Sequence, residues 1–421
     1  MRQPKLFTTI KTYDKSQFIA DLIAGVTVAM VALPLSLAIA IVSGAQPAAG
    51  LVTAIVAGFL ISFFGGSRVQ IGGPTGAFIV VVYSIIADYG YDGLVLATFM
   101  AGIILLVAGY FRAGRLISYV PEAVVSGFTI GIAVIIATSQ LPDFLGLSLE
   151  HVPAEFLEKI PALWEERDSF KPSAFTIAAL TLGLIIAFGR FFPRFPGLII
   201  AVSAGSALVY FAGLSVDTLG SRFGELPSQL PLPKLPTLSF ERVTELLPSA
   251  FVIAFLAGVE SLLSAMVADR MSNGKHRPNA ELLAQGIANI GSALFAGLPA
   301  TGAIARTATN IRAGGKTPVA GLIHALVILL VMLLAAPLAG YLAMPAMAAL
   351  LMITAWNMSE PKKWGEYARG SNRDKFLLLL TMVLTIVVDL TLAIGVGVAL
   401  GLAFEISNRN NSKSDWTPPQ R

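Results

Sequence analysis

Long apolar runs alternate with short polar stretches over most of this chain. A helix needs about 20 mostly apolar residues to cross a bilayer, and many of the runs reach that length. In the first half, the runs predict membrane-spanning helices at 19–42, 48–64, 93–111, 121–139, 173–190 and 197–213. In the second half, they predict spans at 245–268, 281–296, 318–336, 339–356, 375–388 and 391–407.

Two further apolar segments are only half as long, and each begins at a break. The break at 73–77 reads Gly-Pro-Thr-Gly-Ala, and the break at 299–303 reads Pro-Ala-Thr-Gly-Ala. They open half-length helices expected near 74–87 and 301–312. Because the two breaks hold corresponding places in the two halves, the pattern predicts an all-α polytopic membrane protein with fourteen segments, seven in each half.

The polar stretches between the runs set the expected boundaries. These are an N-terminal segment at 1–17, a first repeat at 18–213, a linker loop at 214–242, a second repeat at 243–407 and a tail at 408–421. The linker is rich in proline and is expected to be extended. Two stretches at 150–168 and 359–372 are expected to form amphipathic surface helices.

Composition supports the membrane assignment. Hydrophobic residues make up 55% of the chain and charged residues only 13%, and the mean hydropathy is +0.76. A soluble chain carries about 25% charged residues, so a soluble protein is excluded. The absence of cysteine excludes disulfides and thiol chemistry. The three histidines, His151, His276 and His324, are too scattered to predict a metal site.

The distribution of charge predicts the topology. The net charge of +4 does not indicate a nucleic-acid partner, because Lys and Arg gather at alternate ends of the apolar runs. The loops between them carry acids such as Asp88 and Asp143. The positive-inside rule then places both termini in the cytoplasm, with the protein in the inner (plasma) membrane. An odd number of segments in each half inverts the second half, so the halves form an inverted repeat.

This inversion points the starts of the two half-length helices toward each other. The first N–H groups of a helix have no partner within the helix, and that end is electropositive. Two such ends facing each other inside the bilayer favour a bound anion. The alternative is that each segment is a complete helix with a kink, since Pro and Gly are common in membrane helices.

Glu260 is the most informative ionisable residue, because it lies in the middle of an apolar span. A charged group in lipid is costly, so such residues usually face a cavity and have a function. Glu260 is therefore predicted to carry a coupling proton, with Ser264 one turn further on the same face. The alternative is a neutral acid that only bonds to the broken helix.

Arg306 is the second candidate, about one and a half turns after the second break. Its guanidinium can reach back toward the break and add a full positive charge there. The alternative is an arginine that reaches the interface or forms a structural pair. Thr307, Thr309 and Asn310 are expected to satisfy backbone carbonyls or to face a neighbouring helix.

Other classes of chemistry have little support in the sequence. No nucleophile–base pair or paired carboxylates indicate an enzyme. The glycine-rich break at 72–76 lacks the Lys-Ser/Thr of a P-loop, which argues against an ATP-driven pump. No cofactor is therefore expected.

These segments resemble the sulfate permease (SulP) family of anion transporters between about Phe18 and Ile406. The resemblance is carried by the residues at 21–28, 34, 73–75, 258–263 and 306–317. The residues at 346–351 and 356–357 most resemble a bacterial branch that includes dicarboxylate and sulfate transporters.

The resemblance implies a core domain of segments 1–4 and 8–11 and a gate domain of segments 5–7 and 12–14. It implies an elevator-like movement and a homodimer. It places the substrate at two helix starts, with the set Thr75, Gly76, Ala77, Thr301, Gly302, Ala303, Ile304, Ala305 and Arg306. It assigns coupling to Glu260, and Ser264 falls where sodium-coupled relatives have a threonine.

The chain departs from the family pattern in two places. Some relatives have a glutamine after the proline of the first span, where this chain has Leu35. Side-chain ligands from the first span are therefore not expected. Members of the family usually end in a cytoplasmic STAS domain, and the short polar tail at 408–421 leads us to expect none here.

The function expected from these observations is secondary active transport of a small oxyanion or carboxylate across the lipid bilayer. Sulfate, bicarbonate and C4-dicarboxylates fit equally, and the expected coupling ion is a proton, with sodium as the alternative. A nucleobase transporter of the related fold and an uncoupled anion channel are the rival functions, and an intramembrane enzyme is a remoter one.

Overall fold

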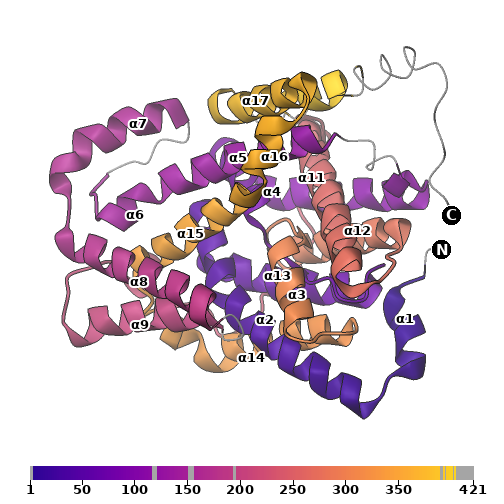
Figure 1. The fold of residues 1–421 in the computed structure, drawn as a ribbon, viewed down its shortest axis with the longest axis horizontal. Helices are drawn as coiled ribbons and strands as arrows, with labels where there is room; N and C mark the ends of the chain where they lie inside the picture. Colours follow the sequence, from indigo (N-terminus) through magenta and orange to yellow (C-terminus); the bar gives the residue numbers. More distant parts are fainter. Residues whose placement is uncertain are drawn as a thin grey trace.

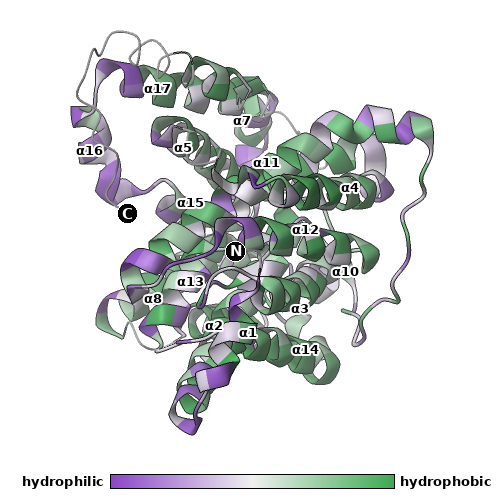
Figure 2. Ribbon diagram, turned by 90° about the vertical axis from the view of Figure 1, so that its right-hand side faces the viewer, coloured by the Kyte–Doolittle hydropathy of each residue, from purple (hydrophilic) through white to green (hydrophobic). Residues whose placement is uncertain are grey.

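The computed structural model describes residues 3–115, 121–149, 156–192, 196–388, 392–393, 395–401 and 403. These residues form a bundle made almost entirely of helices (Figure 1). Seven of the described helices are long and apolar enough to cross a membrane. Hydrophobic residues cover most of these helices, whereas hydrophilic residues concentrate in connecting parts such as the segment around α16 (Figure 2).

The first half follows the predicted order of segments. Its elements are α1 (Lys5–Thr9), α2 (Lys15–Val42), α3 (Pro47–Phe64), β1 (Gly72–Gly73), the 3-10 turn η2 (Gly76–Phe78), α4 (Ile79–Tyr110), α5 (Glu122–Ser139), α6 (Leu141–Leu145), α7 (Phe156–Glu165), α8 (Pro172–Phe191), α9 (Gly197–Phe211) and α10 (Leu219–Phe223). The helix α7 covers part of the predicted surface segment at 150–168, of which 150–155 lie outside the described residues.

The second half contains the counterparts of these segments. Its elements are α11 (Phe240–Ser272), α12 (Pro278–Leu294), β2 (Thr301–Gly302), α13 (Ile304–Arg312), α14 (Val319–Ala339), α15 (Met344–Met358), α16 (Trp364–Arg369) and α17 (Asn372–Val387). Of the last predicted span, at 391–407, residues 392–393, 395–401 and 403 are described, and the tail at 408–421 lies outside the described residues.

The linker differs from the extended loop that the sequence predicts. Residues 219–223 form α10, because the Thr218 side chain caps the helix and Ser221 bonds back to the Thr218 backbone. The Ser239 side chain accepts from Arg242 N, so α11 already begins at Phe240. Residues 214–217 and 224–239 of the linker remain without regular helix or strand.

The two half-length helices are present. The kink in α4 lies at Gly90, whose φ of 70° and ψ of 177° are outside the helical region. Only a residue without a Cβ adopts such a conformation at little cost. The kink therefore separates a half-length helix that begins after Thr75 from the span that follows. The other half-length helix is α13, which ends at Arg312.

The helices fall into two groups by their contacts. In one group, α4 packs on α11 and α12, α14 packs on α2 and α3, and α13 lies between α2 and α11 (Figure 1). In the other, α15 contacts α5, α6, α8 and α9, and α17 contacts α5 and α7. Below, they are the α13 group and the α15 group.

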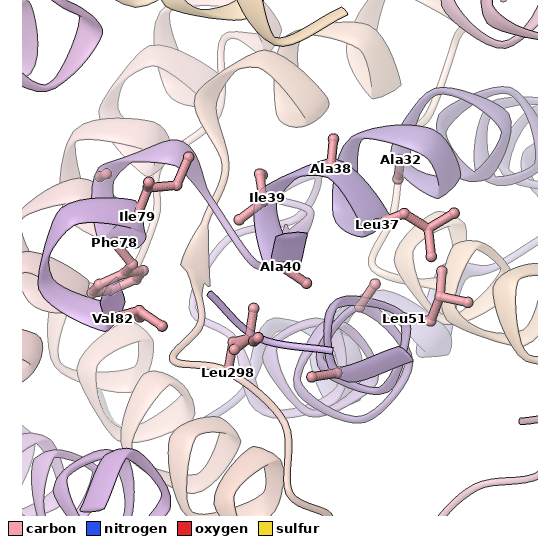
Figure 3. Close-up of a cluster of buried hydrophobic side chains, with 14 of the residues drawn as sticks. Ala32, Leu37, Ala38, Ile39, Ala40, Leu51, Phe78, Ile79, Val82 and Leu298 are labelled. Atoms are coloured by element: carbon pink, nitrogen blue, oxygen red, sulfur yellow. The ribbon is translucent and has the colours of Figure 1, made fainter. Parts of the chain in front are cut away.

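Small residues allow the close packing inside the α13 group. An ideal Cβ on Gly102 of α4 would lie 2.8 Å from the Gly286 carbonyl oxygen on α12, and the reverse distance is also 2.8 Å. Backbones this close exclude any side chain between them. Apolar side chains from α2, α3, η2, the start of α4 and Leu298 fill the interior beside the breaks (Figure 3).

The connection between α14 and α15 is attached to the segment after α9. Three backbone hydrogen bonds form there: Leu219 N to Leu342 O at 2.7 Å, Gly220 N to Gly340 O at 2.8 Å, and Met344 N to Asp217 O at 2.8 Å. The first and the last make an antiparallel bridge between Thr218 and Ala343. This clasp ties the connection between the two groups to the segment that follows α9 of the α15 group.

Candidate functional site

The two breaks lie side by side. The strands β1 and β2 pair antiparallel, with Gly72 opposite Gly302 and Gly73 opposite Thr301. The Ala303 N–H extends the pairing by donating to the Ile71 carbonyl at 2.8 Å. The prediction that the two broken segments meet is confirmed by this pairing. We call Thr75, Gly76 and Ala77 the first half-site, and residues 301–305 the second half-site.

The first half-site is joined to the predicted coupling acid. The Thr75 hydroxyl donates to Glu260 Oε2 at 2.9 Å. Thr75 itself is extended and precedes the first turn of the half-length helix. Glu260 is partly exposed, and no basic side chain lies within 4 Å of it among the described residues. Its carboxylate therefore has a hydroxyl partner and no ion-pair partner.

The second half-site is fixed to the same helix by a different kind of bond. The Thr301 hydroxyl donates to the Ala257 carbonyl of α11 at 2.9 Å. Asn289 of α12 holds the preceding residue twice, with its Nδ2 donating to Ala300 O and its Oδ1 accepting from Ala300 N, both at 2.9 Å. The approach to β2 is thus held by groups that do not titrate.

The two half-sites also differ in access. Gly76 and Ala77 are buried, whereas Ile304 and Ala305 at the start of α13 are exposed. The sequence suggested that the Ala303 N–H binds the substrate. This N–H instead donates to Ile71 O, so it is not free to bind a ligand. The N–H groups of Ile304 and Ala305 belong to the open first turn of the helix, where such groups lack helical partners.

Arg306 lies at the first break although it belongs to the second half. Its side chain is 1% exposed, and Nη2 donates to Ser36 Oγ of α2 at 3.2 Å. An ideal Cβ on Gly73 would lie only 2.3 Å from Arg306 Nη1, so the guanidinium occupies the space that any other residue there would need. The Nε and Nη1 groups have no hydrogen-bond partner among the residues that the structure describes. A buried cation with free donors beside a helix start favours an anion.

Ser36 connects the first span to the site through Arg306. The presence of Leu35 in place of a glutamine led us to expect no side-chain ligand from α2, and that expectation stays a prediction. The hydroxyl of Ser36, the next residue, lies on the buried face of α2 and accepts from Arg306.

Ser264 lies near the site but is not bonded to Glu260. Its hydroxyl pairs with Thr307 Oγ1 at 3.2 Å, and Thr307 Oγ1 also accepts from Ile71 N at 3.1 Å. Asn310 Nδ2 donates to the Val69 carbonyl at 2.8 Å. These bonds confirm the prediction that polar residues of α13 satisfy the backbone and neighbouring helices.

A buried polar cluster behind the first half-site was missed by the sequence interpretation. Its members are Gln70, Ser261, Glu281 and Gln285, which are all fully or almost fully buried and hydrogen-bonded to one another. A signal was present, since Glu281, Gln285 and Asn289 recur every fourth residue in an otherwise apolar helix. That spacing places all three on one face.

The arrangement suits anion binding rather than metal binding. Two helix starts and one buried guanidinium supply positive potential in a space of low polarity. In the described ranges, no three His, Asp or Glu side chains gather as they would around a metal ion. Two cavities of about 640 and 630 Å³ lie elsewhere, under α7 and beside the linker, and neither is lined by a half-site residue.

Known proteins resemble the chain in sequence and in fold. YvdB of Bacillus subtilis, which carries the name of a sulfate transporter, is 45% identical over 373 residues, covering 88% of this chain and 70% of YvdB. The bicarbonate transporter BicA of Synechocystis is 33% identical, with 78% of this chain and 59% of BicA covered. The solved transmembrane domain of a cyanobacterial BicA superposes with a TM-score of 0.81 at 32% identity, covering 90% of this chain and 98% of that domain.

These relatives are named as transporters and not as enzymes. The model of the sulfate permease family matches residues 18–381, which include both half-sites, Glu260 and Arg306. This chain is a multi-pass membrane protein that belongs to the sulfate permease family.

Proposed function

We propose that this protein is a secondary active transporter of a small oxyanion, with sulfate and bicarbonate as the leading substrates. The names of the relatives, a sulfate transporter and a bicarbonate transporter, support this substrate class. A C4-dicarboxylate is the third candidate, because backbone N–H groups select for charge more than for the rest of the molecule.

The observation that carries the proposal is the antiparallel pairing of β1 with β2. It places two helix starts at one position and leaves the guanidinium of Arg306 beside them. We assign the anion to the N–H groups of Gly76 and Ala77 on one side and of Ile304 and Ala305 on the other. The Arg306 side chain would supply the neutralising charge.

Coupling is assigned to Glu260. A carboxylate beside the first half-site repels an anion, whereas a carboxylic acid does not. Protonation of Glu260 would therefore accompany anion binding, and the two would cross the membrane together as a symport. Sodium coupling is the alternative, and Ser264 is the residue predicted for it. Its bond to Thr307 favours the proton, because that hydroxyl already has a partner.

Alternating access is assigned to movement between the two helix groups. The first half has α2, α3, β1 and the two parts of α4 on either side of Gly90. The second half has α11, α12, β2, α13 and α14 in the same order, which supports seven-plus-seven inverted repeats. The α13 group would be the moving core and the α15 group the gate, in an elevator-like mechanism. We also propose that two copies form a homodimer through the gate, and that both termini lie in the cytoplasm.

The test is uptake into proteoliposomes of sulfate, bicarbonate, fumarate and succinate, with and without an inward proton gradient. We expect one of these anions to accumulate against its gradient when the lumen is alkaline. Glu260→Gln should remove the effect of the proton gradient and retain exchange of the anion.

Each of the following results would overturn one part of the proposal. Uptake of uracil or xanthine in place of the anions would support the nucleobase alternative. A steady anion current that does not saturate would support a channel. If Glu260→Gln keeps pH-driven accumulation, the coupling assignment is wrong, although the anion assignment stands.

A further inference from the structure

Glu281 is a completely buried carboxylate without a cation. It lies in the first turn of α12, and its side chain accepts four hydrogen bonds. The donors are Gly66 N at 2.8 Å, Ser67 N at 3.2 Å, Ser261 Oγ at 3.1 Å and Gln285 Nε2 at 3.0 Å. No Lys, Arg or His nitrogen lies within 4 Å of it in the described part of the chain. Within hydrogen-bonding distance, its partners are therefore dipoles and not cations.

Each set of donors leads to one partner of the Thr75–Glu260 bond. Ser261 follows Glu260 directly in α11. Gly66 and Ser67 begin the segment that leads through Gln70 to β1 and Thr75. Gln70 links the two segments directly, because its Nε2 donates to Ser261 Oγ at 2.9 Å and to Ser261 O at 3.2 Å. The acid thus connects the helix of Glu260 to the strand that precedes Thr75.

We propose that Glu281 is a positioning residue that sets the contact between Thr75 and Glu260, and through it the pH dependence of transport. This inference rests on the proposed coupling role of Glu260. Glu281 does not touch the anion in this assignment. It acts by fixing two segments whose separation decides whether the Thr75 hydroxyl reaches the Glu260 carboxylate.

The hydrogen-bond directions require a carboxylate at position 281. Ser261 Oγ accepts from Gln70 Nε2 and from Gln285 Nε2, the latter at 2.7 Å. Both lone pairs of the hydroxyl are then used, so its single hydrogen must point to Glu281 Oε1. On the other side, Oε2 accepts two backbone N–H groups. Every contact made by this side chain is an accepted hydrogen bond.

A glutamine at this position would fit the space and not the chemistry. If its oxygen accepted from Gly66 and Ser67, its NH₂ group would face the Gln285 NH₂ group and the Ser261 hydroxyl hydrogen. Donors would then oppose donors, and a buried unsatisfied donor costs about 1–3 kcal/mol. The segment before β1, the Ser261 side chain or the Gln285 amide, whose Oε1 has no partner among the described residues, would have to move.

The nearby basic side chains belong to other elements. Arg306, on α13, acts electrostatically on Glu260, and His276, between α11 and α12, acts on Glu281 when its ring is protonated. Both remain in place when Glu281 is changed to Gln. A shift in the pH profile of that variant would therefore have two causes. One is a changed position of Glu260 relative to Thr75, and the other is the loss of the Glu281 charge.

The first experiment compares pH profiles of anion uptake for the wild type, Glu281→Gln and Ser261→Ala. Ser261→Ala removes the central hydroxyl and keeps the Glu281 charge, so it separates position from charge. We expect both variants to move the midpoint by at least about half a pH unit, which is roughly twofold to threefold in proton affinity. Asp143→Asn is the control, since it removes an acid from an outer-surface cluster with Arg222, and it should leave the profile unchanged.

A second measurement does not depend on coupling. The chain has no cysteine, so Ala77→Cys gives a single thiol in the first half-site. Its reaction with a maleimide should become at least about threefold faster when Glu281→Gln or Ser261→Ala frees the segment before β1, because opening exposes a buried position.

The outcomes separate this inference from the proposed function. Faster labelling together with shifted midpoints supports positioning. Unchanged labelling and midpoints in folded Glu281→Gln and Ser261→Ala would overturn it. A wild type whose uptake ignores pH would instead reject the coupling role of Glu260, and the labelling result would then decide the positioning role alone. If Glu281→Gln does not fold, Ser261→Ala decides in the same two measurements.

Discussion

The two half-sites have nearly the same sequence and are held in different ways. Both threonine hydroxyls donate to α11, one turn apart. Thr75 donates to the carboxylate of Glu260, and Thr301 donates to the backbone carbonyl of Ala257. The first half-site is therefore connected to a group that can gain a proton, and the second to a group that cannot. Two breaks of nearly the same sequence thus differ in the chemistry of the groups that hold them.

Access to solvent follows the same division. The first turn after Thr75 is buried, whereas the first turn after Thr301 is open at Ile304 and Ala305. Met358, at the end of α15, contributes to the closed side, because its sulfur lies 2.7 Å from the position of an ideal Cβ on Gly76. The structure therefore combines a closed, titratable half-site with an open, fixed one.

Replacing Arg306 should break the comparison most severely, because this residue of the second half carries charge to the first half-site. A hydrogen bond to a charged group contributes about 1.5–3 kcal/mol, so Arg306→Ala should lower the uptake efficiency kcat/KM by about 10- to 150-fold. Arg306→Lys should recover part of the loss, since it restores charge without the planar donors. Initial uptake rates measure both.

The matched control for this change is Arg222→Ala at the outer surface, where the arginine pairs with Asp143 and Asp217. It should keep near-normal uptake. If folded Arg306→Ala protein binds the anion as tightly as the wild type, the guanidinium does not serve the site.

Removing the two threonine hydroxyls tests the division directly. Thr75→Val deletes a donor to the carboxylate, so the charged form is less favoured and the pH profile of uptake should move toward higher pH by up to about one unit. Thr301→Val deletes a bond to a carbonyl. It should leave the pH profile in place and lower Tm slightly, since a neutral hydrogen bond contributes about 1 kcal/mol. Equal shifts in the two profiles would refute the division.

Single cysteines should sharpen the difference in access. Ala305→Cys lies at the open start of α13, and Ala77→Cys is 8% exposed. In this state, a membrane-impermeant maleimide should label position 305 at least about tenfold faster than position 77, because buried thiols react only after local opening. Denatured protein, in which both thiols are accessible, is the reference. Faster labelling at position 77 would mean that the half-sites are exposed in the opposite order.

The smallest effect is expected at Tyr367, in α16. Its hydroxyl donates to Glu360 Oε2 at 2.5 Å and lies 3.1 Å from Ser126 Oγ. Burial, and secondarily the bond to Glu360, raise the pKa of Tyr367 to about 12. Because the pKa is raised by folding, the stabilisation is complete below pH 10 and is lost as the pH rises toward 12.

The corresponding measurement is Tm in detergent across that range. The wild type should lose its advantage over Tyr367→Phe between about pH 10 and about pH 12. The effect is small, because Tyr367 is only partly buried. A constant difference in Tm across this range would show that the phenol does not titrate in contact with Glu360.

Local chemistry made part of this structure predictable. The breaks were visible because Pro, Gly and Thr interrupt apolar runs, and the gap before the following span was marked by Asp88 and Asp92. Glu260 and Arg306 were visible because a charge inside an apolar segment needs a reason. The expected inversion of the second half predicted that the two breaks meet, although it did not predict that they pair as strands.

The missed residues depend on contacts between distant parts of the chain. Gln70 meets Ser261 across 191 positions, and Arg306 meets Ser36 across 270. No local pattern fixes such distances. The spacing of Glu281, Gln285 and Asn289 was a local signal. The segment at 281–296 was predicted as a span from its apolar residues, and its polar face was not interpreted. The partner of Ser264 could not be read from its own helix, because Thr307 reaches it from α13.

The clasp between residues 217–220 and 340–344 limits how the protein can change shape. It anchors the far end of α14 to the neighbouring group through backbone hydrogen bonds, which side-chain substitutions do not remove. Any movement of α14 relative to the α15 group would have to keep or break these bonds, beside Pro337 and Gly340. The elevator-like shift proposed for the α13 group would therefore require this connection to flex, or the clasp to open.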